Sequence, residues 1–128
     1  MPYSDLRQFV NKLEEAGELA RVRKEVNPKY ELGAICKTIH EKGRKALLFE
    51  KVLGCSMPVA TELLGTFKRI AMAIDADESD LFTEVMERTK QSIEPIIVKD
   101  GPCKEVILKD KDVDLDLLPF ILEDVWPK

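Results

Sequence analysis

The sequence predicts a single α/β domain of the mixed α+β kind, in which helices pack on a small mixed sheet. Its 128 residues suit one domain of ordinary size. A composition of 45% hydrophobic and 34% charged residues is typical of a globular chain. Segments with a helical period alternate with segments that have the period of a strand, and this alternation favours a layered fold.

The first part of the chain predicts a helix followed by a half-buried strand. Ser4 is the expected N-cap, and apolar residues recur at helical spacing from Leu6 to Ala16. Gly17 stands where a left-handed residue commonly ends a helix. From Leu19 to Val26 apolar and charged side chains alternate, so we expect one face of this strand to be buried.

A second helix and a second strand follow. Asn27 is the expected cap, with Pro28 at the first helical position and Gly43 at the end. The expected buried face consists of Leu32, Ile35, Cys36 and Ile39. Residues 46–49 are consecutively apolar, which predicts a strand covered on both faces, and Gly54 is a turn residue.

The second half of the chain predicts one more strand and two more helices. The strand lies within residues 57–64, and the helices are capped by Thr66 and Ser79. The apolar positions of these helices are Ile70, Ala71 and Ile74, and then Leu81, Phe82, Val85 and Met86. Residues 93–98 predict an extended edge strand interrupted by Pro95, and residues 106–108 a last short strand.

Charge and cysteine content exclude several classes of protein. A net charge of -4 and a pI near 5.1 argue against a nucleic-acid binder. No apolar run approaches the roughly 18 to 20 residues that span a bilayer, and no secretory signal is visible. Three cysteines without a CxxC pattern predict reduced thiols in a cytoplasmic protein. A single histidine does not predict a zinc site.

The end of the chain has a composition of its own. Acidic residues concentrate in residues 109–119, a run typical of a solvated loop or strand edge, with cation binding as the alternative. Apolar residues then crowd together: Leu117, Leu118, Phe120, Ile121, Leu122, Val125 and Trp126. We therefore divide the chain into a domain over 1–108 and a tail over 109–128. The tail is expected to dock on its own domain or on a protein surface outside this chain.

Lys68 and Arg69 are the candidate binding residues. They stand just inside the helix that Thr66 is expected to cap, where free N–H groups and the helix dipole favour an anion. The alternative is that both charges are simply solvated on the outer face of an amphipathic helix.

The sequence predicts no catalytic centre from spacing alone. It contains none of the patterns GxSxG, GxGxxG, GKS, GKT or HExxH. His40 is expected to be a partly exposed helix-end residue, with a catalytic role as the alternative. Cys36 is expected to be a core thiol, Cys55 a turn residue and Cys103 a plain surface or core residue. These patterns leave the function open.

Seven stretches, in order, resemble the N-terminal region of the UbiD family of prenylated-flavin-dependent decarboxylases. They are SDLRQFVNKLEEAGELARV, NPKYELGAI, ALLFEKVLG with the following MPV, LLGTFKRIAMAI, GPCKE, DVDLDLLP and the final WP. The resemblance covers essentially the whole chain. It implies an α/β domain that precedes a split β-barrel in much longer proteins.

The resemblance also implies a reaction class. Family members reversibly decarboxylate aromatic or α,β-unsaturated carboxylic acids, with prenylated FMN, a divalent metal and potassium. Their catalytic and cofactor-binding residues lie in the central domain. No catalytic, cofactor or metal residue is therefore carried over to this chain, and we expect the chain alone to be inactive and to bind no flavin.

Three hypotheses follow from the resemblance, in order of preference. The chain is part of a UbiD-type decarboxylase; or it is a short accessory subunit of a larger complex; or it is an interaction module that binds an anion through Lys68 and Arg69. We expect a cytoplasmic homo-oligomer, or a larger complex, assembled through the C-terminal tail.

Overall fold

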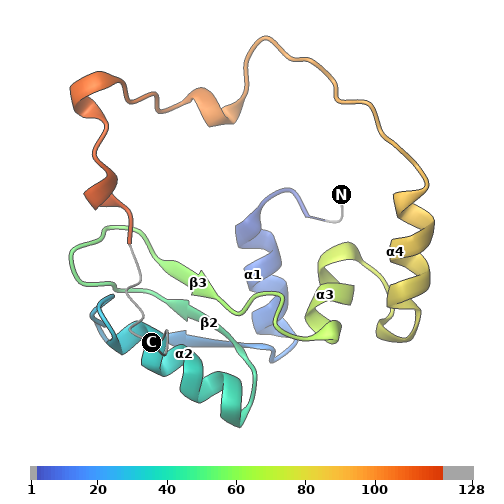
Figure 1. Ribbon diagram of the computed structural model, residues 1–128, viewed down its shortest axis with the longest axis horizontal. Helices are drawn as coiled ribbons and strands as arrows, with labels where there is room; N and C mark the ends of the chain where they lie inside the picture. The colour runs from blue at the N-terminus through green and yellow to red at the C-terminus, as the bar shows by residue number, and fades with distance from the viewer. Residues whose placement is uncertain (1–2, 120–128) are drawn as a thin grey trace, which may run out of the picture.

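The structure is a computed structural model that describes residues 3–119, and Figure 1 shows a layered body with a long arm. The body contains four helices, α1 (Leu6–Glu15), α2 (Glu31–Lys42), α3 (Phe67–Ile74) and α4 (Leu81–Thr89). Its sheet contains β1 (Leu19–Val22), β2 (Ala46–Phe49) and β3 (Val59–Thr61). The predicted mixed α+β class is confirmed.

The three strands pair in chain order. β1 runs parallel to β2, with Leu19 opposite Ala46 and Val22 opposite Phe49. A parallel pair needs a crossover connection, and α2 supplies it. β3 runs antiparallel to β2, with Val59 opposite Phe49.

Helices cover both faces of the sheet. On one face α1 buries Phe9, Val10 and Leu13 against Leu19 and Ala46. On the other face the core holds Leu32 of α2 together with Val26, Leu47, Phe49, Val52 and Val59. Alternate residues of β2 thus enter different cores, as the period of a strand requires. The predicted strand with two covered faces over 46–49 is confirmed.

The second helix begins later than the sequence predicts. Asn27 does not cap it, because its side chain accepts a hydrogen bond from the Lys29 backbone N–H (2.8 Å) in a local turn. The helix begins at Glu31, after Tyr30 in a left-handed conformation (φ 70°). Its expected inner face and its end at Gly43 are confirmed.

Two other predicted caps are wrong. Asp5, rather than Ser4, caps α1, because its Oδ1 accepts from the Gln8 backbone N–H (2.8 Å). A short 3-10 turn over Glu78–Asp80 precedes α4, so Ser79 lies inside that turn and does not cap the helix. The left-handed backbone of Gly17 (φ 71°) after α1 is as predicted.

The strand boundaries also differ from the predicted ones. β1 ends at Val22, and Val26 makes a separate bridge to Val52. β3 is shorter than the predicted range of 57–64. Residues 93–98 and 106–108 form no strand, because no neighbouring strand is present in the described residues to pair with them.

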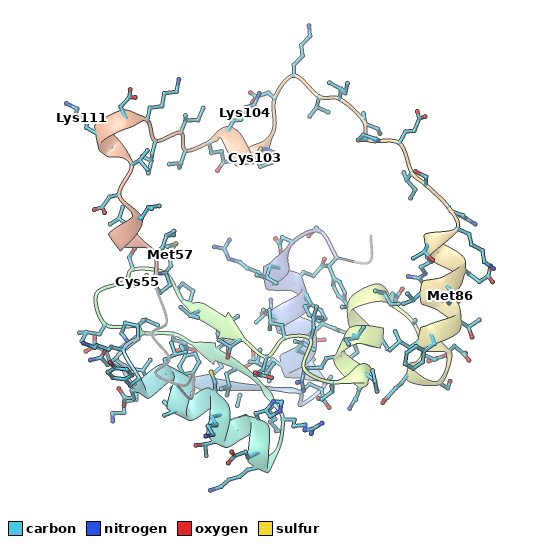
Figure 2. The ribbon with its side chains drawn as sticks, viewed as in Figure 1. Cys55, Met57, Met86, Cys103, Lys104 and Lys111 are labelled. Atoms are coloured by element: carbon cyan, nitrogen blue, oxygen red, sulfur yellow. The ribbon has the colours of Figure 1, made fainter. Side chains whose placement is uncertain are left out.

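Residues 90–119, called the arm below, leave the body after α4. The arm holds three short 3-10 turns, and its apolar side chains are exposed, Ile93 at 92% and Ile97 at 96%. Cys103, Lys104 and Lys111 lie far from the sheet in Figure 2. The arm returns to the body near Cys55, whose Sγ lies 3.5 Å from the Leu117 carbonyl oxygen. The predicted tail residues beyond Pro119 lie outside the described part of the chain.

Within residues 3–119, no helix combines the length and the apolar character that crossing a membrane requires.

Candidate functional site

The polar centre of the molecule lies at the N-terminus of α3. Thr66 has an extended backbone, and its hydroxyl accepts a hydrogen bond from the Arg69 backbone N–H (3.3 Å). This bond satisfies one of the free N–H groups of the first turn. The predicted Thr66 cap is confirmed, and it fixes where Lys68 and Arg69 emerge from the helix.

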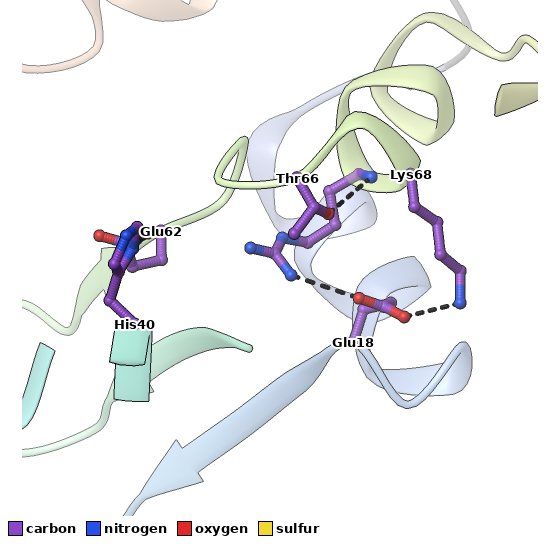
Figure 3. A network of polar contacts seen from close by, with 6 residues as sticks. Glu18, His40, Glu62, Thr66 and Lys68 are labelled. Atoms are coloured by element: carbon purple, nitrogen blue, oxygen red, sulfur yellow. Dashed lines mark hydrogen bonds and ion pairs between the residues drawn. The ribbon is translucent and has the colours of Figure 1, made fainter. Parts of the chain in front are cut away.

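Both candidate cations bind the same carboxylate. Lys68 Nζ lies 2.6 Å from Glu18 Oε1, and Arg69 Nη1 lies 3.2 Å from Glu18 Oε2 (Figure 3). Hydrogen bonding from Lys68, followed by the charges of Lys68 and Arg69, lowers the pKa of Glu18 although partial burial opposes this. Glu18 therefore remains an anion and joins the turn after α1 to α3.

The two cations differ in burial. The Lys68 side chain is 51% exposed, whereas that of Arg69 is 1% exposed. Arg69 is the only buried charged residue among those described. A charge this deep needs partners, because moving it out of water is costly.

Arg69 is only partly satisfied by those partners. Its Nη1 binds Glu18, but Nε and Nη2 are buried and have no hydrogen-bond partner among the described residues. Gly65 lies directly against this end of the guanidinium. A Cβ at Gly65 would lie 2.8 Å from Arg69 Nη2 and 2.7 Å from Glu62 Oε2.

Glu62 connects this centre to α2. Its Oε2 lies 3.4 Å from His40 Nδ1, and both side chains appear together in Figure 3. Glu62 has a left-handed backbone (φ 58°), and its carbonyl accepts from the Gly65 N–H (3.2 Å). The turn between β3 and α3 therefore presents the Glu62 carboxylate above Gly65.

A hollow of about 320 Å³ lies beside the same turn. Apolar side chains of Leu64, Phe67 and Ile70 line it, together with the charged Arg44 and Glu78. Phe67 also contacts Phe82 of α4 edge to face, with ring centroids 5.6 Å apart.

The remaining candidates lie apart from this centre. Cys36 faces Thr61, with Sγ and Oγ1 3.3 Å apart, so it is a partly buried residue of the inner face of α2. Cys55 lies in a turn and Cys103 lies on the arm. All three cysteines, each in the described part of the chain, are thiols.

Sequence reasoning found the two cations and His40 but missed both carboxylates that bind them. Glu18 is 51 positions from Arg69, and Glu62 is 22 positions from His40. Neither spacing carries a local signal. The first pair meets because α3 packs on the core that α1 shares with β1 and β2. The anion contact proposed for Lys68 and Arg69 stays a prediction, although both side chains bind Glu18.

The sequence and the fold of this chain are similar to those of known proteins. Residues 10–89 match the sequence family described as the 3-octaprenyl-4-hydroxybenzoate carboxy-lyase N-terminal domain. The structure resembles the UbiD-class enzyme HmfF from Pelotomaculum thermopropionicum in complex with FMN, with 30% sequence identity and a TM-score of 0.82. That match covers 94% of this chain and 27% of the HmfF chain.

Two further solved structures are similar in the same way. Vanillic acid decarboxylase of Sedimentibacter hydroxybenzoicus, in open form, is 34% identical with a TM-score of 0.79, over 91% of this chain and 27% of that chain. Apo 3,4-dihydroxybenzoic acid decarboxylase AroY of Klebsiella pneumoniae is 25% identical with a TM-score of 0.79, over the same shares. This chain spans about a quarter of the length of the enzymes that it matches.

Proposed function

Because this chain belongs to the UbiD family, we propose that it serves as the N-terminal domain, or as a short subunit, of a UbiD-type decarboxylase. The enzyme would act on aromatic or α,β-unsaturated carboxylic acids. The observation that carries the proposal is a fold match over 94% of this chain to 27% of a UbiD-class enzyme. The solved enzymes named as acting on vanillic and 3,4-dihydroxybenzoic acid support the substrate class.

The role proposed for this chain is structural rather than catalytic. One relative is described in complex with prFMN, which supplies an electron sink for decarboxylation when it is bound. Residues 3–119 offer no group of three His, Cys, Asp or Glu side chains able to hold a metal ion beside such a cofactor. We therefore assign no reaction step to these residues, and we place prenylated FMN, its divalent metal and potassium in the parts of the enzyme that this chain does not match.

The arm supports this assignment. Its side chains Ile93, Ile96, Ile97 and Val98 are exposed, at 67% or more each, although they are strongly apolar. Apolar surface of this extent stabilises a protein only when it is covered. The 94% coverage of the HmfF match extends beyond the body into the arm. We propose that the arm joins this domain to the rest of the enzyme.

An activity measurement tests the proposal. The 128-residue chain is incubated with reduced prenylated FMN, desalted, and examined for flavin absorbance and for CO2 release from cinnamic and vanillic acids. We expect neither flavin retention nor turnover. A chimera in which this chain replaces the matched N-terminal part of the Sedimentibacter hydroxybenzoicus vanillic acid decarboxylase is expected to retain flavin and to release CO2 from vanillic acid.

Two variants of the chimera test whether the arm contacts the rest of the enzyme. Ile97→Asp, on the exposed arm, is expected to impair the chimera without unfolding the isolated domain. Lys99→Asp, a nearby change on the same segment, serves as the control. Stoichiometric flavin and turnover by the isolated chain would contradict the proposal.

The second candidate function is that of an accessory subunit or anion-binding module. The burial of Arg69 at the N-terminus of α3, where its Nε and Nη2 have no partner among the described residues, favours it. Titration with inorganic phosphate and with benzoate, followed through the backbone N–H signals of Phe67 and Lys68, tests this alternative. No movement of either signal would exclude an anion contact there.

We also propose self-association in the cytoplasm through the C-terminal end of the chain. The exposed arm and the apolar residues that follow it support this proposal. Sedimentation of the intact chain beside a chain ending at Asp116 distinguishes the cases. A monomer in both samples would contradict assembly through the tail.

A further inference from the structure

Glu62 lies near His40 of α2 and Arg69 of α3. Its Oε2 is 3.4 Å from His40 Nδ1 at the end of α2. The same oxygen lies 2.7 Å from the point where a Cβ at Gly65 would be, and Arg69 Nη2 lies 2.8 Å from that point. Because Gly65 has no side chain, the carboxylate and the guanidinium face each other across a bare Cα.

His40 and Arg69 differ in how well their polar groups are satisfied. His40 is 52% exposed, so water solvates its ring in either protonation state. Arg69 is 1% exposed, and its Nε and Nη2 have no partner within the described residues. An unsatisfied buried N–H costs far more than an exposed one. A carboxylate that moved from His40 to Arg69 would satisfy the group with the larger need.

The protonation of His40 decides between these positions. A protonated imidazole is a cation that attracts Glu62, whereas a neutral imidazole has lost that charge. Arg69 keeps its charge whether His40 is protonated or neutral, because a guanidinium does not lose its proton in proteins. We propose that Glu62 is a proton-controlled switch, bound to His40 at low pH and to Arg69 when His40 is neutral.

Other charged and titratable groups lie around the switch. Toward Arg69 the other facing charge is Glu18, which is already bound by Lys68 and by Arg69 Nη1. Arg44 and Glu78 line the same hollow as Gly65. Cys36 lies on the inner face of α2, beside Thr61 of β3.

The switch has a structural consequence for the turn before α3. Glu62 begins the turn that Gly65 closes, and Leu64, Gly65 and Thr66 line the hollow. When the Glu62 carboxylate moves from His40 to Arg69, the turn is bound to α3 instead of α2. The shape of the hollow that the turn lines should then change.

The side-chain Nε–H signal of Arg69 in a proton–nitrogen NMR spectrum of the full chain reports the switch directly. We expect this signal to move sigmoidally with pH as the imidazole changes its charge. The movement should be lost in His40→Asn and in Glu62→Gln. Glu41→Gln removes a carboxylate next to His40 in the sequence and should leave the movement intact.

Gly65→Ala provides a steric test that keeps every charge. The new Cβ would collide with both Glu62 Oε2 and Arg69 Nη2, so we expect the pH-dependent movement to be lost. The backbone amide spectrum of each variant shows whether it is folded. A wild-type signal that stays constant with pH, or a movement that persists in His40→Asn, would overturn the proposal. A movement unchanged in Gly65→Ala would exclude transfer across Gly65.

Discussion

Glu18 and Arg69 lie 51 residues apart in sequence and are joined by a hydrogen bond of 3.2 Å between Oε2 and Nη1. The pair connects the residue before β1 to the inner side of α3. Removing Glu18 takes away the carboxylate that binds Arg69 Nη1 inside the protein, so we expect Glu18→Ala to lower the free energy of unfolding by about 3 to 5 kcal/mol.

Urea denaturation measures this effect. Glu15→Ala is the control, because Glu15 is exposed and its lysine partner Lys12 is 3.8 Å away. We expect a change of about 0.5 kcal/mol or less for the control. Equal midpoints for the two variants would show that Arg69 does not depend on Glu18.

The same carboxylate makes the stability of the chain depend on pH. Lys68 and Arg69 lower the pKa of Glu18 in the folded state from its ordinary value of 4.5. Its contribution is therefore complete above that value and is lost as the pH falls through the lower pKa of the folded state. Between about pH 6 and 3, we expect the unfolding free energy to fall more steeply for the wild type than for Glu18→Gln. Parallel curves in urea titrations would contradict this assignment.

Adjacent residues of β2 provide a test of the core. Leu47 is 1% exposed in the core under α2, whereas Leu48 is only partly buried on the opposite face. Leu47→Ala is expected to cost about 2 to 5 kcal/mol, and Leu48→Ala clearly less. Thermal unfolding of the two variants checks the order, and a greater loss for Leu48→Ala would show that the faces are assigned wrongly.

Gly17 and Gly43 allow backbone strain to be measured without a steric clash. Gly17 has φ 71°, and Gly43 has φ -163°, while neither has an atom near enough to touch an added Cβ. Gly17→Ala is expected to cost about 1 kcal/mol or more, because alanine is strained in the left-handed region. Gly43→Ala should be neutral or slightly stabilising. Circular dichroism melting curves of both variants measure the difference.

The arm should contribute little to the stability of the body. A chain ending at Gln91 keeps all four helices and the whole sheet, since every one of them lies within residues 6–89. We expect it to unfold at a temperature within a few degrees of the intact chain. A loss of about ten degrees or more, on the scale where 1 kcal/mol shifts the midpoint by roughly 4 to 8 °C, would show that the arm packs on the body.

The sequence predicted those parts of the fold that depend on local pattern. The stripe of α1, the Thr66 cap and the doubly buried strand β2 each follow from residues close together in the chain. Asn27 was misread because an Asx turn and a helix cap use the same side-chain oxygen.

The predicted strands that failed depend on partners distant in the chain. Residues 93–98 have the composition of a strand, but a strand forms only where another strand can pair with it. The same limit explains why only part of the candidate site could be predicted. Lys68 and Arg69 are visible in the sequence as cations, whereas Glu18 becomes their partner only through the packing of α3.

The order of the strands in the sheet has a consequence for synthesis on the ribosome. Because β1, β2 and β3 pair in the order in which they are made, each strand can dock on one that has already emerged. Only 51 residues separate the Glu18 carboxylate from Arg69, its partner in α3. At roughly 5 to 20 residues per second, the ribosome makes these residues within seconds. The strands of the body can therefore assemble one after another while the chain is still being made.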